Sequence, residues 1–196
     1  KYEKYREVIG KYTLLPQVKF STDIRKKDYG TLKVQEKVSL FRVLADLSVP
    51  VRNPFPMPME KLDQSYGYIL YHTALEREQN LEKIRLWGAN DRANIFVDNK
   101  PVITLYDREL LAEAQVNVDF ESGAPLDILI ENMGRVNFGP RMEYQRKGIE
   151  GCVQLNGHMH YNWDMYTLPL DNLDKLDFTK GYKEGTPGFY RFTFEV

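Results

Sequence analysis

A stretch of polar groups and glycines follows an apolar strand pattern, and there residue types and spacing first suggest chemistry. Residues 126–130, LDILI, form a short apolar and partly β-branched run that predicts a buried strand. Residues 131–139, ENMGRVNFG, follow it directly. Gly134 and Gly139 permit backbone angles that are closed to other residues, so the turn can aim polar side chains out of the strand end.

Two interpretations of this turn are open. In the functional one, Arg135, Asn137 and Phe138 bind a substrate, because planar polar groups beside an aromatic ring suit a sugar. In the structural one, Asn132, Arg135 and Asn137 bind backbone carbonyls and fix the loop, because buried polar groups are normally hydrogen-bonded. We favour the structural interpretation, with Asn132, Gly134 and Gly139 as the turn residues and Phe138 as a possible pocket wall.

Histidines and the single cysteine are the remaining candidates for metal or nucleophilic chemistry. His158 and His160 are two residues apart, which on a strand places both imidazoles on one side. No third ligand accompanies them, so we predict no metal site, and we interpret His72 as structural. Cys152 has no basic neighbour in its strand pattern to activate a thiolate, so we expect a small buried residue.

Carboxylates are plentiful, but the sequence shows no catalytic pair. Glycoside hydrolysis needs two facing carboxyl groups about 5 to 9.5 Å apart on a rigid frame. Glu131 and Glu143 flank the polar turn and are the formal candidates, while exposed or salt-bridged side chains are the simpler interpretation. Phosphate loops, nucleophile elbows and paired CxxC motifs are absent, so we predict no active site and no cofactor.

Composition predicts a globular β-rich protein. Of the 196 residues, 42% are hydrophobic and 13% aromatic, which suits pleated surfaces and a substantial core. The net charge is -1 and the basic residues are scattered, which disfavours a nucleic acid or an anionic membrane as partner. No apolar run is long enough to span a bilayer.

Short strand patterns recur at regular spacing and predict an all-β fold with little helix, an antiparallel β-sandwich or jelly roll. Asp98-Asn99 and Asn156-Gly157 are predicted hairpin turns. Four prolines make residues 49–59 an extended strap that cannot be a central strand. The predicted helices cover residues 1–15, 41–47 (capped by Ser39) and 108–114, and the predicted strands cover residues 31–40, 66–73, 81–87, 93–97, 102–105, 116–120, 126–130, 152–155, 166–170 and 189–196.

The chain starts with Lys1 inside a helical pattern and without an initiator Met, so we interpret it as a fragment whose targeting signal, if any, would lie upstream. The compartment therefore stays open. The predicted organisation is a connector at 1–30, a first β-segment with the proline-rich strap at 31–65, a β-sandwich at 66–170, and closing strands at 171–196 that belong to a first or further sandwich.

Several ordered segments together carry a family resemblance that covers most of the chain. They are residues 56–73 (PMPMEKLDQSYGYILYHT), 91–98 (DRANIFVD), 131–139 (ENMGRVNFG), 147–149 (KGI) and 187–190 (PGFY). These segments resemble the all-β, galactose-binding-like region that follows the catalytic barrel in β-galactosidases of glycoside hydrolase family 35. Two departures stand out, because Phe138 occupies a position where the family usually has Tyr, and His72 one where it usually has Arg.

The resemblance implies a parent enzyme that hydrolyses terminal β-galactosyl residues with retention, using two glutamates on a TIM barrel. Neither glutamate motif is present in residues 1–196, so we expect a non-catalytic portion that packs against the barrel and walls its galactoside pocket. Two alternatives remain: an independent carbohydrate-binding module, for which Arg135, Asn137, Phe138, Tyr144 and Trp163 are suitable residue types, and an interdomain or oligomer assembly module.

Overall fold

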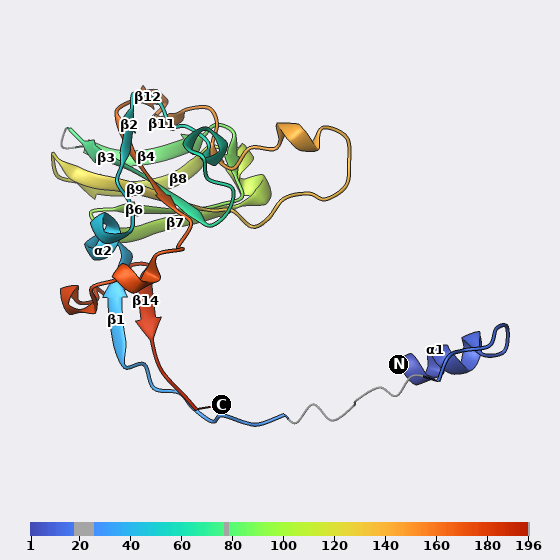
Figure 1. The fold of residues 1–196 in the computed structure, drawn as a ribbon. Helices are drawn as coiled ribbons and strands as arrows, with labels where there is room; N and C mark the ends of the chain where they lie inside the picture. Colours follow the sequence, from blue (N-terminus) through green and yellow to red (C-terminus); the bar gives the residue numbers. More distant parts are fainter. Residues whose placement is uncertain (18–25, 77–78, 196) are drawn as a thin grey trace. The chain divides into compact units, whose positions relative to one another are not determined.

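The computed structural model describes residues 1–17, 26–76 and 79–195, and the chain divides into two compact units. One unit takes in the ends of the chain, up to Lys33 and from Phe194 onward. It holds helix α1, Tyr2–Ile9, in which no residue is buried. The other unit, residues 34–193, contains every described strand (Figure 1).

The larger unit is an antiparallel β-sandwich with two main sheets. A six-stranded sheet has the order β2-β13-β3-β9-β6-β7, and a four-stranded sheet has the order β12-β11-β4-β8. Two short ladders, β1-β14 and β5-β10, complete the pairing. The strands are β1 Glu36–Ser39, β2 Val51–Asn53, β3 Tyr68–Leu75, β4 Gln79–Leu86, β5 Ala89–Asn90, β6 Arg92–Val97, β7 Lys100–Tyr106, β8 Ala114–Phe120, β9 Ala124–Glu131, β10 Gly148–Ile149, β11 Val153–Leu155, β12 His158–His160, β13 Trp163–Leu168 and β14 Gly188–Arg191.

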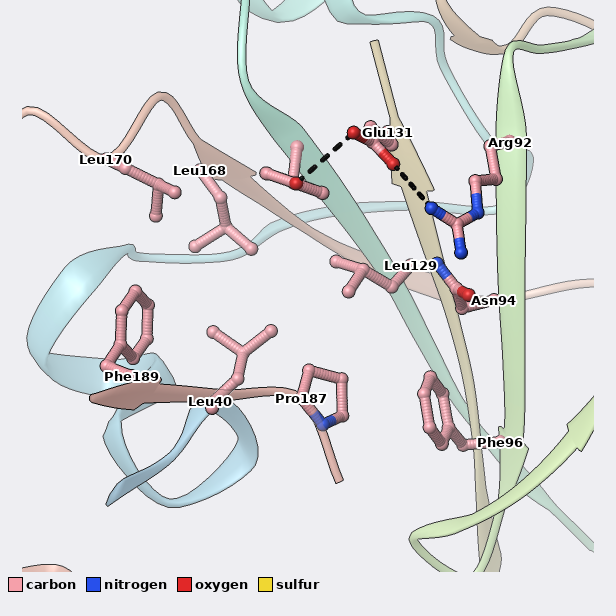
Figure 2. A pocket seen from close by; sticks show the side chains of 12 residues that line it. Leu40, Arg92, Asn94, Phe96, Leu129, Glu131, Leu168, Leu170, Pro187 and Phe189 are labelled. Carbon is pink, nitrogen blue, oxygen red and sulfur yellow. Dashed lines mark hydrogen bonds and ion pairs between the residues drawn. The ribbon is translucent and has the colours of Figure 1, made fainter. Parts of the chain in front are cut away.

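Both faces of the six-stranded sheet are covered. On its outer face, Leu70, Phe96 and Leu129 pack with helix α2, Leu40–Leu47, and with the β1-β14 ribbon. The rings of Phe41 and Phe96 meet edge to face with their centroids 5.3 Å apart. Figure 2 shows Leu40 and Phe189 of this covering layer opposite Leu129 and Phe96 of the sheet. This second apolar layer explains why β9 is buried along nearly its whole length.

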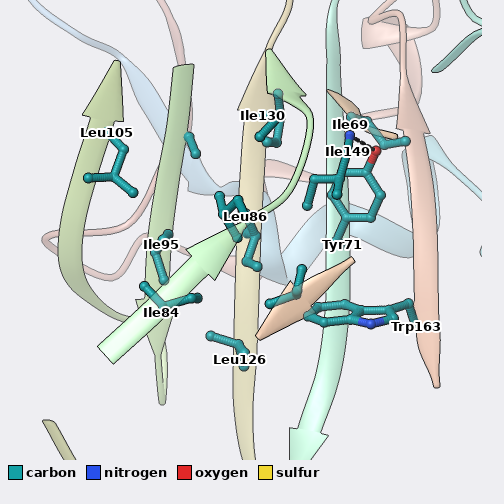
Figure 3. Close-up of a cluster of buried hydrophobic side chains, with 14 of the residues drawn as sticks. Ile69, Tyr71, Ile84, Leu86, Ile95, Leu105, Leu126, Ile130, Ile149 and Trp163 are labelled. Carbon is teal, nitrogen blue, oxygen red and sulfur yellow. Dashed lines mark hydrogen bonds between the residues drawn. The ribbon is translucent and has the colours of Figure 1, made fainter. Parts of the chain in front are cut away.

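The inner face of the six-stranded sheet meets the four-stranded sheet across the main core (Figure 3). Ile69, Ile95, Ile128 and other alternate residues point into it, as the period of two in a strand requires. Trp163 is fully buried there and meets the ring of Tyr71 edge to face, with 6.5 Å between centroids. The predicted fold class, an all-β antiparallel sandwich with little helix, is therefore confirmed.

The predicted turns and the strap are confirmed in detail. Asp98 and Asn99 both have positive φ (52° and 57°), as do Asn156 and Gly157 (49° and 82°). Two successive positive φ values characterise the type I′ turn, whose twist matches paired strands. Within the strap, only residues 51–53 form a strand, and this strand, β2, lies at the edge of the six-stranded sheet. Prolines are tolerated there because an edge strand leaves some N–H positions unpaired.

Helix predictions are only partly correct. Helix α2 follows Ser39 as predicted, but the Ser39 hydroxyl caps nothing and instead accepts the backbone N–H of Lys183 at 2.7 Å. The predicted helix 108–114 is wrong, because a 3₁₀ turn, η2 Asp107–Leu111, stands there and Ala114 already begins β8. Helix α1 is shorter than the predicted 1–15. The other 3₁₀ turns are η1 Met59–Leu62, η3 Met142–Tyr144, η4 Leu173–Lys175 and η5 Phe178–Lys180.

The predicted strands near the chain ends are too long. The strand predicted at 31–40 covers only Glu36–Ser39, and Val34 is exposed. The strand predicted at 189–196 ends at Arg191 as far as the described residues go. Alternation at these ends does not reflect burial, because the ribbon pairs only over four residues of each strand. The short strands β2, β5, β10 and β12 were not predicted, since two or three residues carry no periodicity.

The contributions of two histidines to the stability of the sandwich depend on pH in opposite directions. The His72 Nδ1 lies 2.8 Å from the Asp127 carboxylate, whose hydrogen bond raises the pKa of His72 above its ordinary value of 6.5. Burial lowers the pKa of His160 below the same value. Protonated His72 therefore stabilises the fold below about pH 6.5, and this contribution is lost as the pH rises through its folded pKa. The contribution of neutral His160 is present above about pH 6.5 and is lost on acidification.

We expect His72→Gln to separate the two effects. Glutamine can still donate a hydrogen bond to Asp127 but cannot carry charge, so the loss of unfolding free energy relative to wild type should be larger at about pH 5.5 than at about pH 8.5. Urea unfolding at both values measures it. His160→Gln is the control and should show the reverse trend. Losses of unfolding free energy that do not depend on pH would contradict the assigned directions of the two pKa shifts.

Both α-helices in the described part of the chain have eight residues, too few to span a bilayer.

Candidate functional site

The polar turn predicted from the sequence is the start of a long loop that joins two strands. The β9-β10 loop, residues 132–147, begins where β9 ends at Glu131 and finishes where β10 begins at Gly148. It extends away from the two sheets and carries the η3 turn on its outer part, in orange in Figure 1. Such a loop needs fixed points at its base, and the structure supplies two groups of them.

Arg135 makes the first group of contacts. Its guanidinium pairs with the Glu60 carboxylate at 2.7 Å and donates to the Ser65 carbonyl at 3.3 Å. It also donates to the carbonyl of Gln145 on the returning arm of the loop at 3.3 Å. The planar guanidinium suits this task because its donors point in several fixed directions at once. Arg135 therefore joins both arms of the loop to the η1 turn.

Lys147 and Asp91 make the second group. The Lys147 Nζ lies 2.6 and 2.7 Å from the two Asp91 carboxylate oxygens, and the lysine side chain is only 1% exposed. Asp91 also accepts the backbone N–H of Met133 at 2.8 Å. The backbone N–H of Lys147 donates to Glu60 at 3.0 Å, which connects the two groups of contacts. We call Glu60, Asp91, Arg135 and Lys147 together the loop clamp.

The first turn of the loop depends on Asn132 and Gly134. The Asn132 side chain donates to the Ser65 carbonyl at 3.0 Å and accepts the N–H of Gly134 at 3.0 Å. Gly134 and Gly139 have φ of 104° and 139°, a region that favours glycine. These contacts fix where the chain leaves β9 and turns toward the outer part of the loop.

The outer part of the loop carries apolar side chains in solvent. Phe138 is 91% exposed, and Asn137 beside it is exposed and makes no hydrogen bond within the described part of the chain. Of the two side chains expected to fix the loop, Arg135 makes the contacts given above, while Asn137 makes none among the described residues. The further exposed apolar residues of the loop are Met133, Val136, Met142 and Tyr144.

Most carboxylates at the loop base face a basic side chain. Glu60 and Asp91, the carboxylates of the clamp, face Arg135 and Lys147. Glu131 receives Arg92 at 3.3 Å and the Tyr68 hydroxyl at 3.4 Å, while Glu143 lies in η3 on the outer loop. Three of these four carboxylates, those of Glu60, Asp91 and Glu131, are thus held by basic side chains.

The structure places His158 and His160 on β12 and Cys152 directly before β11. His158 and His160 line a common pocket of about 300 Å³, but the His160 Nε2 is engaged with the Thr73 hydroxyl at 3.0 Å. Among residues 1–17, 26–76 and 79–195, no group of three or more potential ligands could hold a metal ion. Cys152 is half-buried, and its carbonyl accepts the N–H of Trp87.

The loop clamp was not predicted from the sequence, although its residues lie in the segments that carry the family resemblance. Asp91 and Lys147 stand 56 positions apart, and Glu60 and Arg135 are even farther apart in the sequence. A lysine in sequence is normally taken as exposed, and nothing near Lys147 signals its burial. The quoted segments DRANIFVD and KGI each contain one half of the ion pair, which is the only signal that was available.

The fold and the clamped loop define the class of the molecule, an antiparallel β-sandwich domain with a long projecting loop. Residues 56–169 match the family described as "Beta-galactosidase, first all-beta domain", and the chain belongs to this family. The resemblance to the all-β region of β-galactosidases is thereby confirmed.

Relatives along the chain agree with the family match. The chain is 31% identical over 190 residues to "Beta-galactosidase 8" of Oryza sativa, covering 90% of this chain and 28% of the relative. It is 29% identical over 197 residues to a "Beta-galactosidase" of Xanthomonas manihotis, covering 100% and 32%. The human "Beta-galactosidase" is 30% identical over 181 residues, covering 90% and 26%. The chain thus spans about a quarter to a third of the length of these curated relatives.

Proposed function

We propose that the chain is the non-catalytic β-sandwich portion of a retaining β-galactosidase of glycoside hydrolase family 35. The parent enzyme hydrolyses terminal β-galactosyl residues, and its catalytic TIM barrel is the partner of this domain. The family match, the names of the relatives and their greater length support a place in such an enzyme. The assignment to family 35 rests on the five ordered sequence segments.

The geometry of the β9-β10 loop is the main support for a role in packing against the barrel. Its base is fixed by the loop clamp, while Phe138 and its apolar neighbours on the outer part are exposed. Several exposed apolar side chains on a fixed loop favour an interaction site, because soluble proteins rarely expose large apolar groups together without a partner. In the parent enzyme this surface packs on the barrel beside the galactoside pocket.

Of the three candidate substrate-binding residues, two have side chains that are free to contact a ligand and one is already bound within the domain. Phe138 and Asn137 have no partner within the described part of the chain, so the ring is available as a pocket wall and the amide as a hydrogen-bond donor and acceptor. Arg135 is bound to Glu60 and two carbonyls. Its role is therefore to position the other two. The phenylalanine at 138 lacks a hydroxyl, so its contribution to the pocket is apolar contact.

Phe138→Ala tests the pocket wall in the polypeptide that joins this domain to its catalytic domain. We expect KM for p-nitrophenyl β-D-galactopyranoside to rise about tenfold, because apolar contact with bound substrate is lost. The unfolding free energy of the 196-residue chain should change by less than about 0.5 kcal/mol, because Phe138 is 91% exposed. Val49→Ala, at a side chain that is 84% exposed and lies outside the loop, is the control. An unchanged KM would remove Phe138 from the pocket.

The absence of catalysis in the chain itself has a direct test. The purified 196-residue chain should hydrolyse the same substrate no faster than buffer does. An enzyme-like rate would overturn the proposal, because it would require an active site within these residues.

A further inference from the structure

A pocket of about 460 Å³ lies on the outer face of the six-stranded sheet, beneath the layer made by α2 and β14 (Figure 2). None of residues 132–147 lines it, so it is separate from the β9-β10 loop. Phe96, Leu129 and Leu168 form its floor on the sheet, and Leu40 and Phe189 face them from the covering layer. This volume is within the range of small-molecule sites.

One end of the pocket is polar because of strand register. Tyr68, Glu131 and Arg92 stand directly opposite one another on β3, β9 and β6. The contacts of Glu131 with the Tyr68 hydroxyl and with Arg92 are long, at 3.4 and 3.3 Å, and leave much of its acceptor capacity free. Arg92 and Glu131 carry opposite charges, so this end favours a neutral polar group over an ion.

Asn94 extends the polar end by one row along β6. Its side-chain oxygen accepts the Thr104 hydroxyl at 2.9 Å, while its amide nitrogen has no partner within the described part of the chain. The pocket thus offers donors from Arg92 and Asn94 and acceptors from Glu131 and Tyr68. A hydroxyl group both donates and accepts, so several hydroxyls on one ring match this set better than a single-function group does.

We propose that this pocket binds a neutral glycoside that carries an apolar aglycone. The sugar hydroxyls meet Arg92, Asn94 and Glu131, and the aglycone lies between the aromatic rings of Phe96 and Phe189, which supply the apolar part of the site. The proposal goes beyond a structural role beside the barrel, since it uses neither the loop nor the catalytic domain. Its failure would leave the role of Phe138 untouched.

Calorimetric titration of the 196-residue chain tests the site. The probes are phenyl 1-thio-β-D-galactopyranoside, its gluco epimer and methyl β-D-galactopyranoside, of which the thioglycosides resist hydrolysis. We expect saturable binding of at least one phenyl thioglycoside, at least about tenfold tighter than the methyl glycoside because the phenyl ring is buried. Absence of saturable heat for both thioglycosides overturns the proposal.

Matched variants locate the binding. Asn94→Asp keeps the oxygen that accepts Thr104 but removes the amide donor, and Arg92→Met keeps the length of the side chain but removes the guanidinium. Each should weaken binding of the phenyl thioglycoside by about tenfold, as expected for the loss of a hydrogen bond in a ligand site. Arg108→Met, at an exposed arginine that does not line the pocket, should leave it unchanged. Equal affinity of all three variants would place the ligand elsewhere and overturn the assignment.

Discussion

Gly148→Ala is expected to destabilise the domain by about 3 kcal/mol or more. A Cβ at this position would lie 2.3 Å from the Tyr71 hydroxyl, and the residue has a φ of +84°. The Tyr71 hydroxyl has little freedom to withdraw, because it donates to the Met57 carbonyl and accepts the N–H of Ile149, both at 2.8 Å. A methyl group therefore breaks two buried hydrogen bonds as well as crowding the core.

Gly123→Ala is the control for backbone strain. Gly123 has nearly the same φ, +85°, but nothing lies within 4 Å of its would-be Cβ. Its replacement should cost only about 1 kcal/mol, the penalty of a left-handed conformation. Urea unfolding of both variants measures the difference. Equal losses at the two glycines would show that the contact with Tyr71 does not matter.

A double variant tests the mechanism behind the Gly148 prediction. Tyr71→Phe removes the hydroxyl that the new methyl group would meet, so Gly148→Ala should cost less in the Tyr71→Phe background than in wild type. Additive losses would mean that the two positions do not interact. The burial that holds this tyrosine in place also raises its pKa, so its phenol stays protonated and able to donate in the folded domain.

Asp91→Asn is expected to lower the unfolding free energy by about 3 kcal/mol. The Lys147 side chain is 1% exposed, and Asp91 is its only ion-pair partner among the described residues. Asparagine keeps the shape of aspartate and one acceptor oxygen but leaves the lysine charge buried without compensation. Urea unfolding measures the loss, and faster proteolytic cleavage within residues 132–147 should accompany it, because the clamp also fixes the loop.

Lys147→Met is the matched partner of that experiment. It removes the buried charge together with the ion pair, and the carboxylate left behind is 23% exposed and still accepts the N–H of Met133. Its unfolding free energy should therefore fall by less than that of Asp91→Asn. A larger loss for Lys147→Met would show that side-chain packing, and not the uncompensated charge, dominates at this site.

The fold was largely predictable from the sequence because local signals determine it. Asp98-Asn99 and Asn156-Gly157 favour positive φ, so both hairpin turns could be predicted from their residue types. The prolines of the strap exclude a central strand, which left an edge position for any strand within it. The strand predicted at residues 126–130 lies within β9, Ala124–Glu131, because its apolar run reflects burial on both faces of the strand. Where burial was absent, as at Val34, alternation without a partner strand gave a false prediction.

The candidate site was predictable only in its location. Residues 131–139 were singled out as a shaped turn, but the sequence could not show that Arg135 is bound to Glu60 while Asn137 is exposed. The pocket on the outer sheet face was not predictable at all. It depends on the register that places Tyr68, Glu131 and Arg92 in one row, and register between distant strands leaves no mark in a single sequence.

The β1-β14 ribbon has a mechanical consequence. Glu36 pairs with Arg191 and Ser39 with Gly188, so the chain reaches and leaves the sandwich at the same end of one short antiparallel ladder. A force that separates the two flanking segments would load these hydrogen bonds one pair at a time, as in unzipping, and would not shear them together. The ribbon would open at low force while the ten strands of the two main sheets stay paired. The sandwich itself would therefore be protected from tension applied through its flanking segments.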